Sequence, residues 1–386
     1  MATNNNNKAL NVPHLRFPEF SGEWKKVRLG EICNMLCGYA FNGEDIVEQG
    51  SYLLMRGINI TEGSIRHSSE LDRYYSGSIE KLDKYKLAVG DLVIGMDGSK
   101  VGRNSAIVSS YEDGSYLVQR VCRIKSSIGN NYILQFINNT KFHQYVDTVK
   151  TSSAIPHISL GDIQNFRISI PPTQDETDKI AKLFLLLDER IATQNKIIER
   201  LETLIKGLRN EIFWKLRKNV GFNAMIGDVL DYEQPQSYIV EDTEYIDKGT
   251  PVLTANKAFI LGYTSETEGI YDKGDCIIFD DFTLDSKYVD FPFKVKSSAI
   301  KILTAENKEL LRYTFEFLKY LDLSTSEHKR HYIAETQNQE FILPTTQIVR
   351  TIAHTFSILS LRMETAIKQR LLFEKQKQYL LRQMFI

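Results

Sequence analysis

The chain has 386 residues, of which 42% are hydrophobic and 25% are charged, and its formal net charge is −1. This composition is typical of a globular protein with two or three domains, and it excludes a basic protein that coats nucleic acid without sequence preference. No apolar run approaches the roughly 18 residues of a membrane helix, and the N-terminus lacks a secretory signal pattern, so we expect a cytoplasmic protein.

The four cysteines, Cys33, Cys37, Cys122 and Cys276, form no CxxC pair and have no histidine neighbour at metal-binding spacing. We therefore expect buried, reduced thiols and no metal on this chain, with a zinc site as the alternative.

Residues 1–21 are predicted to be a tail and a lead-in. The Asn-rich stretch 1–11 has nothing to bury, and we expect it to be disordered. The proline and aromatic residues that follow suggest an extended segment laid over a domain surface.

Residues 22–172 are predicted to form a mainly β domain. Short apolar runs separated by Gly-Asp, Asp-Gly and Gly-Ser turns extend from Val27 to Ile124. Apolar spacing predicts one helix over 131–149. The stretch 151–173 is predicted to be a loop and a last strand, which the double proline ends.

Residues 173–219 are predicted to form one long helix that pairs with another helix. Thr173 and Glu176 have the spacing of a capping box, and apolar residues then recur at alternating steps of four and three. A helix of about 45 residues would span roughly 65 Å. Its predicted seam positions are Ile180, Phe184, Leu187, Ile191, Gln194, Ile198, Leu201, Ile205, Leu208 and Ile212.

The same pattern returns 172 residues later, so the chain reads as a tandem repeat. Leu29-Gly30-Glu31-Ile32 has its counterpart in Ile226-Gly227-Asp228-Val229. Residues 220–344 are predicted to form a second domain and residues 345–386 a second long helix. The seam positions of this helix are Ile352, Phe356, Leu359, Met363, Ala366, Arg370, Phe373, Lys377, Leu380 and Met384.

The predicted fold class is α+β, with two mixed, mainly β domains in tandem and two long helices between them that form an antiparallel coiled coil. The alternative is two unrelated helices that each pack on their own domain. If Ile180 lies level with Met384, Gln194 lies opposite Arg370, and polar seam residues of this kind commonly specify register.

The loop 96–106, MDGSKVGRNSA, follows a predicted strand. It lacks the Gly-Lys-Ser/Thr order of a phosphate-binding loop. It is better interpreted as a tight turn that presents Lys100, Arg103 and Asn104 to DNA, since these residue types bind phosphates and read base edges. An ordinary solvated hairpin remains the alternative.

The stretch 326–333, SEHKRHYI, places basic residues inside an acidic region. Residues 220–344 contain 12 Lys and Arg against 22 Asp and Glu, a net charge of −10. The basic cluster suits a polyanion or, equally, a salt-bridged helix end, and the histidine spacing gives only weak support for a metal. No methyltransferase, Walker or Ser/His/Asp motif accompanies it.

The sequence resembles the DNA specificity subunit of type I restriction-modification systems. The resemblance lies in VPHLRFPEFSGEW, GDLVIGMDGSKVGRNSAI, SSAIPHISLGDIQNFRISIPP and KGLRNEIF, and in GDCIIFDDFT and FILPTT of the second half. The family's usual Glu-Gln pair inside each long helix is reduced to Glu176-Thr177 and replaced by Ile348-Val349.

The resemblance implies two target-recognition domains that each read one half of a bipartite, interrupted site in double-stranded DNA. The helices would set the spacer and dock two methylation subunits, and restriction subunits would complete the complex. The chain would not be an enzyme. S-adenosylmethionine would be bound by the methylation subunit, and ATP with magnesium by the restriction subunit.

The resemblance also suggests which residues contact DNA, in two groups. In the first domain they are Gly98, Ser99, Lys100, Arg103, Asn104, Thr151, Ser152, Ser153 and His157. In the second domain they are Thr283, Lys287, Lys329, Arg330, His331 and Tyr332.

Two other classes stay open on the sequence. The chain could be a self-contained methyltransferase or nuclease with an unrecognised site, or a purely structural coiled-coil adaptor. Because the second domain is acidic, we expect the isolated chain to bind DNA poorly and to depend on basic surface from its partners.

Overall fold

The computed structural model describes residues 11–255, 258–325, 327 and 329–386. It divides into two compact units. Unit 1 comprises Met1–Thr193 and Arg370–Ile386, and unit 2 comprises Gln194–Gln369. The long helices α5 (Gln174–Asn219) and α7 (Thr346–Met384) contribute residues to both units. The predicted domain boundaries at 172, 219 and 344 remain predictions.

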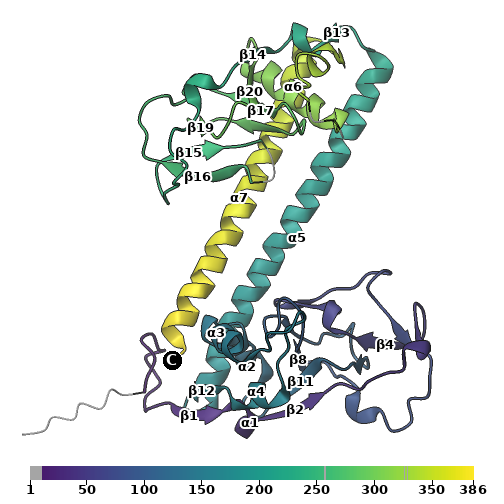
Figure 1. The fold of residues 1–386 in the computed structure, drawn as a ribbon, viewed down its shortest axis with the longest axis vertical. Helices are drawn as coiled ribbons and strands as arrows, with labels where there is room; N and C mark the ends of the chain where they lie inside the picture. The colour runs from purple at the N-terminus through teal and green to yellow at the C-terminus, as the bar shows by residue number, and fades with distance from the viewer. Residues whose placement is uncertain (1–10, 256–257, 326, 328) are drawn as a thin grey trace, which may run out of the picture. The chain divides into compact units, whose positions relative to one another are not determined.

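Unit 1 contains two main sheets and two short pairs, β1-β12 and β5-β6 (Figure 1). One sheet has the order β2-β11-β8-β9 and is antiparallel throughout; the other has the order β10-β4-β7-β3 and contains one parallel pair, β10 with β4. The strands are β1 (Lys25–Arg28), β2 (Cys33–Cys37), β3 (Ile46–Val47), β4 (Tyr52–Met55), β5 (Ile60–Thr61), β6 (Ser64–Ile65), β7 (Tyr74–Tyr75), β8 (Leu92–Gly95), β9 (Ser105–Ile107), β10 (Tyr116–Leu117), β11 (Val121–Ser126) and β12 (Arg167–Ile170). The prediction of a mainly β domain is confirmed.

The helices of unit 1 correct two predictions. The single helix over 131–149 is wrong: α2 (Asn130–Ile137) ends and α3 (Thr140–Val149) begins anew, because the Asn139 side chain accepts a hydrogen bond from Lys141 N and caps α3. The stretch 151–173 contains a further helix, α4 (Leu160–Asn165), in addition to the predicted strand. A short helix α1 (Leu29–Ile32) follows β1.

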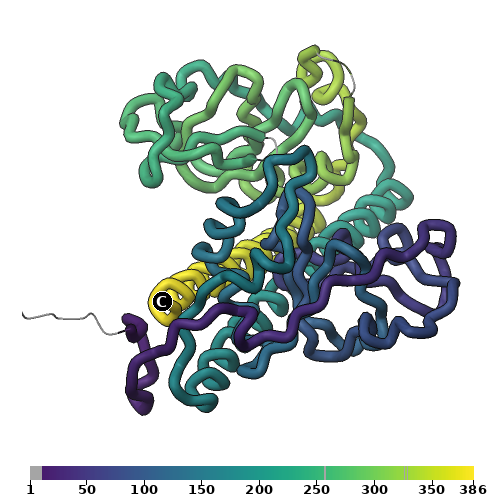
Figure 2. The backbone as a smooth tube through the Cα atoms, turned by 60° about the horizontal axis from the view of Figure 1, so that its bottom comes forward, coloured from purple at the N-terminus to yellow at the C-terminus, as the bar shows by residue number. Residues whose placement is uncertain are grey.

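The N-terminal lead-in is anchored in unit 1. Residues 1–10 lie outside the described residues, but the prediction of disorder is wrong for Asn11, whose carbonyl accepts a hydrogen bond from Trp24 N at 2.8 Å. Leu15 N donates to Gln383 O at 3.0 Å, and Figure 2 shows this purple segment beside the end of α7. The lead-in therefore joins the end of α7 to the domain.

The predicted capping box at the start of α5 forms only in part. Glu176 N donates to Thr173 Oγ1 at 3.4 Å, but the buried Glu176 carboxylate does not return to the Thr173 backbone. It accepts two hydrogen bonds of 2.7 Å from Arg16 and one from Trp24 Nε1 at 3.3 Å. The lead-in, rather than the helix itself, balances this buried charge.

The core of unit 1 combines the domain with both long helices. Ile180 and Phe184 of α5 and Leu381 of α7 lie in one cluster with the domain's strands and with α2. The Phe385 ring packs against the rings of Phe136 and Phe184, at centroid distances of 4.6 and 5.4 Å. Both ends of the described chain therefore stabilise the same core.

Unit 2 repeats this topology. Its sheet β14-β20-β17-β18 is antiparallel throughout, as is β2-β11-β8-β9, and its sheet β16-β15-β19 again contains one parallel pair. Helix α6 (Lys308–Leu321) follows β20 as α2 follows β11. The strands are β13 (Ala224–Met225), β14 (Asp231–Glu233), β15 (Thr250–Leu253), β16 (Ile260–Thr264), β17 (Cys276–Asp280), β18 (Ser286–Val289), β19 (Lys294–Val295), β20 (Ile300–Thr304) and β21 (Glu340–Phe341).

Residues at equivalent positions have the same structural role in the two units. Gly90 and Gly274 each precede a central strand, β8 or β17, and adopt φ values of +87° and +99°, a conformation that favours glycine. Phe213, at the end of α5, packs against Tyr313 and Phe317 of α6, as Phe385 packs against α2. These pairs support the duplication that the sequence predicts.

Every predicted seam position on α5 and α7 is buried or half-buried. In unit 1, Lys377 Nζ donates to Asp188 Oδ1 at 2.6 Å; in unit 2, the Arg209 guanidinium lies 5.8 Å from the Phe356 ring. Both pairs lie within one residue of the predicted antiparallel register. The seam pair Gln194 and Arg370 stays a prediction.

The α+β fold class with two long helices is confirmed. None of the helices in the described ranges is long and apolar enough to cross a membrane.

Candidate nucleic-acid interface

In unit 1, the structure brings the two predicted DNA-contact loops together. Asp97 and His157 form an isolated antiparallel bridge, and Gly98 N donates to Pro156 O at 3.0 Å. The loop 97–104, which follows β8, therefore lies beside the loop 151–157, although more than 40 residues separate them in the sequence. Gly98 has φ +92° at the turn.

Local hydrogen bonds fix the second of these loops. The Thr151 hydroxyl accepts a hydrogen bond from His157 N at 3.0 Å and lies 3.0 Å from His157 Nδ1. The Ser153 hydroxyl donates to Ile155 O at 2.7 Å. Ile155 is 65% exposed at the tip, an apolar residue that the sequence reasoning missed.

The basic side chains of the first loop pair with carboxylates. Lys100 Nζ lies 3.0 Å from Glu62 Oε1, and Arg103 Nη2 lies 2.9 Å from Asp147 Oδ2. All four side chains are between 41% and 63% exposed, so these are surface ion pairs, which contribute little to stability. A phosphate could replace either carboxylate at small cost.

In unit 2, the corresponding loop also follows the central strand. β17 ends at Asp280, and the next residues include the candidate Thr283, whose backbone N–H donates to Asp280 Oδ1 at 3.0 Å. The second candidate segment, 329–332, is attached here because Asp281 Oδ1 accepts hydrogen bonds from His331 N and Tyr332 N, at 3.0 and 2.7 Å.

Two of the predicted contact residues are wrong. Tyr332 is fully buried and His331 is 1% exposed, so neither side chain can reach a ligand on the surface. Their backbone N–H groups instead donate to the Asp281 carboxylate. The other oxygen of this carboxylate lies 3.4 Å from the buried Lys301 ammonium. His331 Nδ1 lies 2.8 Å from Glu335 Oε2, and this hydrogen bond raises the pKa of the histidine.

The other basic contact candidates of unit 2 are exposed or half-buried. Lys329 pairs with Glu327 at 2.6 Å and Glu335 at 2.8 Å, as the salt-bridged alternative predicts for it. Arg330 is exposed and lies 5.9 Å from the Phe282 ring. Lys287, on β18, is half-buried. The pKa of Lys319 is lowered by the burial of Lys319 and next by the charge of Lys287.

The cysteines are free thiols, three of them buried and Cys37 half-buried. Burial raises the pKa of Cys33 to about 11 and of Cys276 to about 12. Within the described part of the chain, no group of His, Cys, Asp or Glu is arranged to hold a metal ion.

Residues 21–203 match the family described as Type I restriction modification DNA specificity domain. The chain is 43% identical over 151 residues to the Type I restriction enzyme EcoR124I/EcoR124II specificity subunit of Escherichia coli, covering 37% of this chain and 35% of that protein. It is 29% identical over 179 residues to the EcoAI specificity subunit of Escherichia coli, covering 45% and 29%. The alignments thus span about a third of these relatives.

The crystal structure of a Type-I restriction-modification system S subunit from M. genitalium aligns with 97% of this chain and 99% of its own, with a TM-score of 0.69 and 14% identity. This likeness concerns the fold. Residues 21–203 are therefore similar to a type I DNA specificity domain. The family match covers 183 of the 386 residues, just under half of the chain.

Proposed function

We propose that this chain is the DNA sequence-recognition subunit of a type I restriction-modification complex and that it reads a bipartite, interrupted site in double-stranded DNA. Each unit would read one half-site. Methyl transfer and cleavage would be performed by methylation and restriction subunits, which would carry S-adenosylmethionine, ATP and magnesium.

One observation carries this proposal. In each unit, polar loops distant in sequence meet at the end of the central strand of an antiparallel sheet, after β8 in one unit and after β17 in the other. Lys100, Arg103, Lys329 and Arg330 are accessible cations at these positions. Asn104 and Ser152 offer donors and acceptors for base edges.

Exposed apolar residues on the long helices support the docking of two methylation subunits. Leu186, Leu204, Leu361 and Leu372 are 48–64% exposed on α5 and α7, outside the seam. Exposed apolar side chains on a helix that already has a packed seam favour a further protein partner.

A map of methylated bases across the genome, in cells with and without this chain, tests the proposal. We expect a bipartite motif to lose its methylation when the chain is absent. Re-expression of the chain should restore it. Methylation that persists unchanged, or methyl transfer by the purified chain alone, would contradict the proposal.

A further inference from the structure

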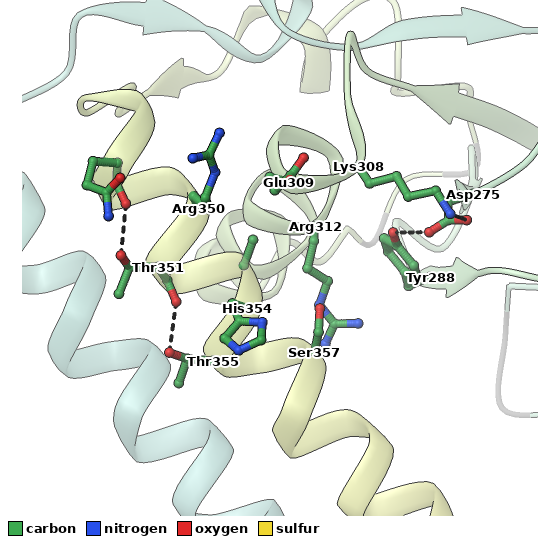
Figure 3. Close-up of a pocket in the computed structure, with 12 residues that line it drawn as sticks. Asp275, Tyr288, Lys308, Glu309, Arg312, Arg350, Thr351, His354, Thr355 and Ser357 are labelled. Atoms are coloured by element: carbon green, nitrogen blue, oxygen red, sulfur yellow. Dashed lines mark hydrogen bonds and ion pairs between the residues drawn. The ribbon is translucent and has the colours of Figure 1, made fainter.

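A groove in unit 2 lies where the first turns of α6 and α7 meet the edge of β17 and β18 (Figure 3). It encloses about 570 Å³, large enough for several side chains of another molecule. Lys308 and Arg312 reach it from α6, Arg350 and His354 from α7, and Asp275 from the residue before β17. We call this the unit 2 groove.

In the described part of the chain, two basic side chains in the lining of the unit 2 groove are unpaired. Asp275 is already satisfied by Lys308 Nζ and by the Tyr288 hydroxyl, each at 2.8 Å. Among the residues that the structure describes, Arg350 and His354 have no ion-pair partner. Glu309 is the remaining acid in the lining. The first turn of α7 contains no acidic residue, whereas that of α5 contains Asp175 and Glu176. The positive end of the α7 dipole is therefore uncompensated by its own sequence.

A second, independent observation points to a ligand. Arg312 is 8% exposed. Its Nη2 donates to Glu316 Oε1 at 2.7 Å, to Ser360 Oγ at 2.5 Å and to Phe356 O at 3.3 Å, but its Nε has no hydrogen-bond partner within the described residues. In Figure 3 its side chain extends from α6 toward Ser357 of α7. A buried donor of this kind costs free energy unless an acceptor reaches it.

The groove recurs in unit 1 at the matching place. A smaller groove of about 230 Å³ lies between the start of α2, at Asn130 and Tyr132, and the first turns of α5, at Asp178 and Lys182. The 172-residue offset takes Asp178 to Arg350 and Lys182 to His354. The position therefore belongs to the repeated architecture, while its charge differs between the halves.

The unit 2 groove lies away from the candidate DNA-contact loops. Asp275 precedes β17, whereas Asp281, which holds the segment 329–332, follows it. A five-residue strand separates the two by roughly 17 Å. The exposed Ile358 and Leu361 lie on the same side of α7 as His354, at 100° per residue, and suit a protein partner rather than DNA.

We propose that the unit 2 groove receives an aspartate or glutamate side chain of a methylation subunit, which Arg350 and His354 bind while the apolar neighbours on α7 are covered. This inference rests on the proposed function and specifies where and by what chemistry one partner docks. The carboxylate would also supply an acceptor for the buried Arg312.

The test measures binding of the purified methylation subunit to the full chain by native mass spectrometry and calorimetry. We expect Arg350→Glu to weaken the binding of one copy at least tenfold, so that complexes with one copy replace complexes with two. Lys248→Glu, a charge reversal on an exposed loop of unit 2, should stay within twofold of the unaltered chain. Thermal unfolding of both variants should match the unaltered chain, because Arg350 is exposed.

A photo-crosslinking residue in place of Thr351 identifies the occupant. We expect it to capture a methylation-subunit peptide that contains Asp or Glu. Capture of DNA or of a second copy of this chain would overturn the inference, as would Arg350→Glu binding like the unaltered chain. If the unaltered chain binds no methylation subunit, the proposed function fails first, and the two failures are thus distinguishable.

Discussion

The thiol of Cys37 illustrates how one neighbour sets the chemistry of a side chain. Cys37 on β2 and Cys122 on β11 are direct partners in the antiparallel register. A hydrogen bond from the Cys122 thiol stabilises the Cys37 thiolate and lowers the pKa of Cys37 to about 7, while the pKa of Cys122 is raised by the same contact and by burial. The sequence predicted reduced cysteines but could not distinguish this one.

We expect Cys37 to be the first thiol that iodoacetamide modifies, because the thiolate is the nucleophile and Cys37 is half-buried rather than buried. Its rate should rise through pH 7 and level off by about pH 8, followed by peptide mass spectrometry. In Cys122→Ala the thiol donor is absent, and we expect the rise to move to higher pH. A rate that still climbs steeply at pH 9 in the unaltered chain would contradict the assignment.

Individual residues also show where sequence reasoning fails. His331 and Tyr332 belong to a basic cluster, and nothing local reveals that Asp281, 50 residues earlier, draws their backbone inward. Arg350 and His354 were not singled out, because the groove depends on Lys308 and Asp275 from other elements. The lack of acidic residues in the first turn of the second long helix is the feature of the sequence that could have indicated this groove.

At the scale of elements, the β strands and long helices could be predicted because their patterns repeat over many residues. The short helix α4 has six residues, less than the window over which helical spacing is visible. The break between α2 and α3 depends on a single capping residue, Asn139. The spacing of apolar residues does not reveal such a cap.

The loop 97–104 makes an element-scale prediction about DNA affinity. In the assembled complex, Lys100→Ala with Arg103→Ala should weaken binding to every sequence alike. It should also reduce the slope of log K against log salt by about 2, since each lost phosphate contact removes about 0.9. Titration across salt concentrations measures this. Lys141→Ala, an exposed lysine on α3, should leave the slope unchanged. An unaltered slope in the double variant would assign both cations to their carboxylate partners alone.

At the scale of the whole molecule, the long helices are the feature that composition alone would not require. α5 has 46 residues and α7 has 39, and seven residues of α-helix rise about 10 Å. The repeat in sequence, the matching sheet orders and the matching ends of the helices all describe one duplicated plan.

Inserting one heptad into either long helix should change the spacer between the two half-sites by about three base pairs, at 3.4 Å per base pair, and leave both half-sites intact. Methylome mapping of cells that carry the variant reads out the spacer and the half-sites together. Insertion of a heptad-length loop between β14 and β15 is the matched control. An unchanged spacer in the helix variant would refute the view that the long helices set the spacer.

The shared core of unit 1 has a consequence for synthesis. Leu381, Met384 and Phe385 complete a core whose other members lie before residue 194. At about 5–20 residues per second, the ribosome needs roughly 10–40 s to cover the intervening stretch. Throughout that interval the nascent first domain keeps apolar surface uncovered, so we expect it to depend on chaperones more than a self-contained domain of its size does. A ribosome that stalls late in the message should leave the earliest-made part of the protein unfinished.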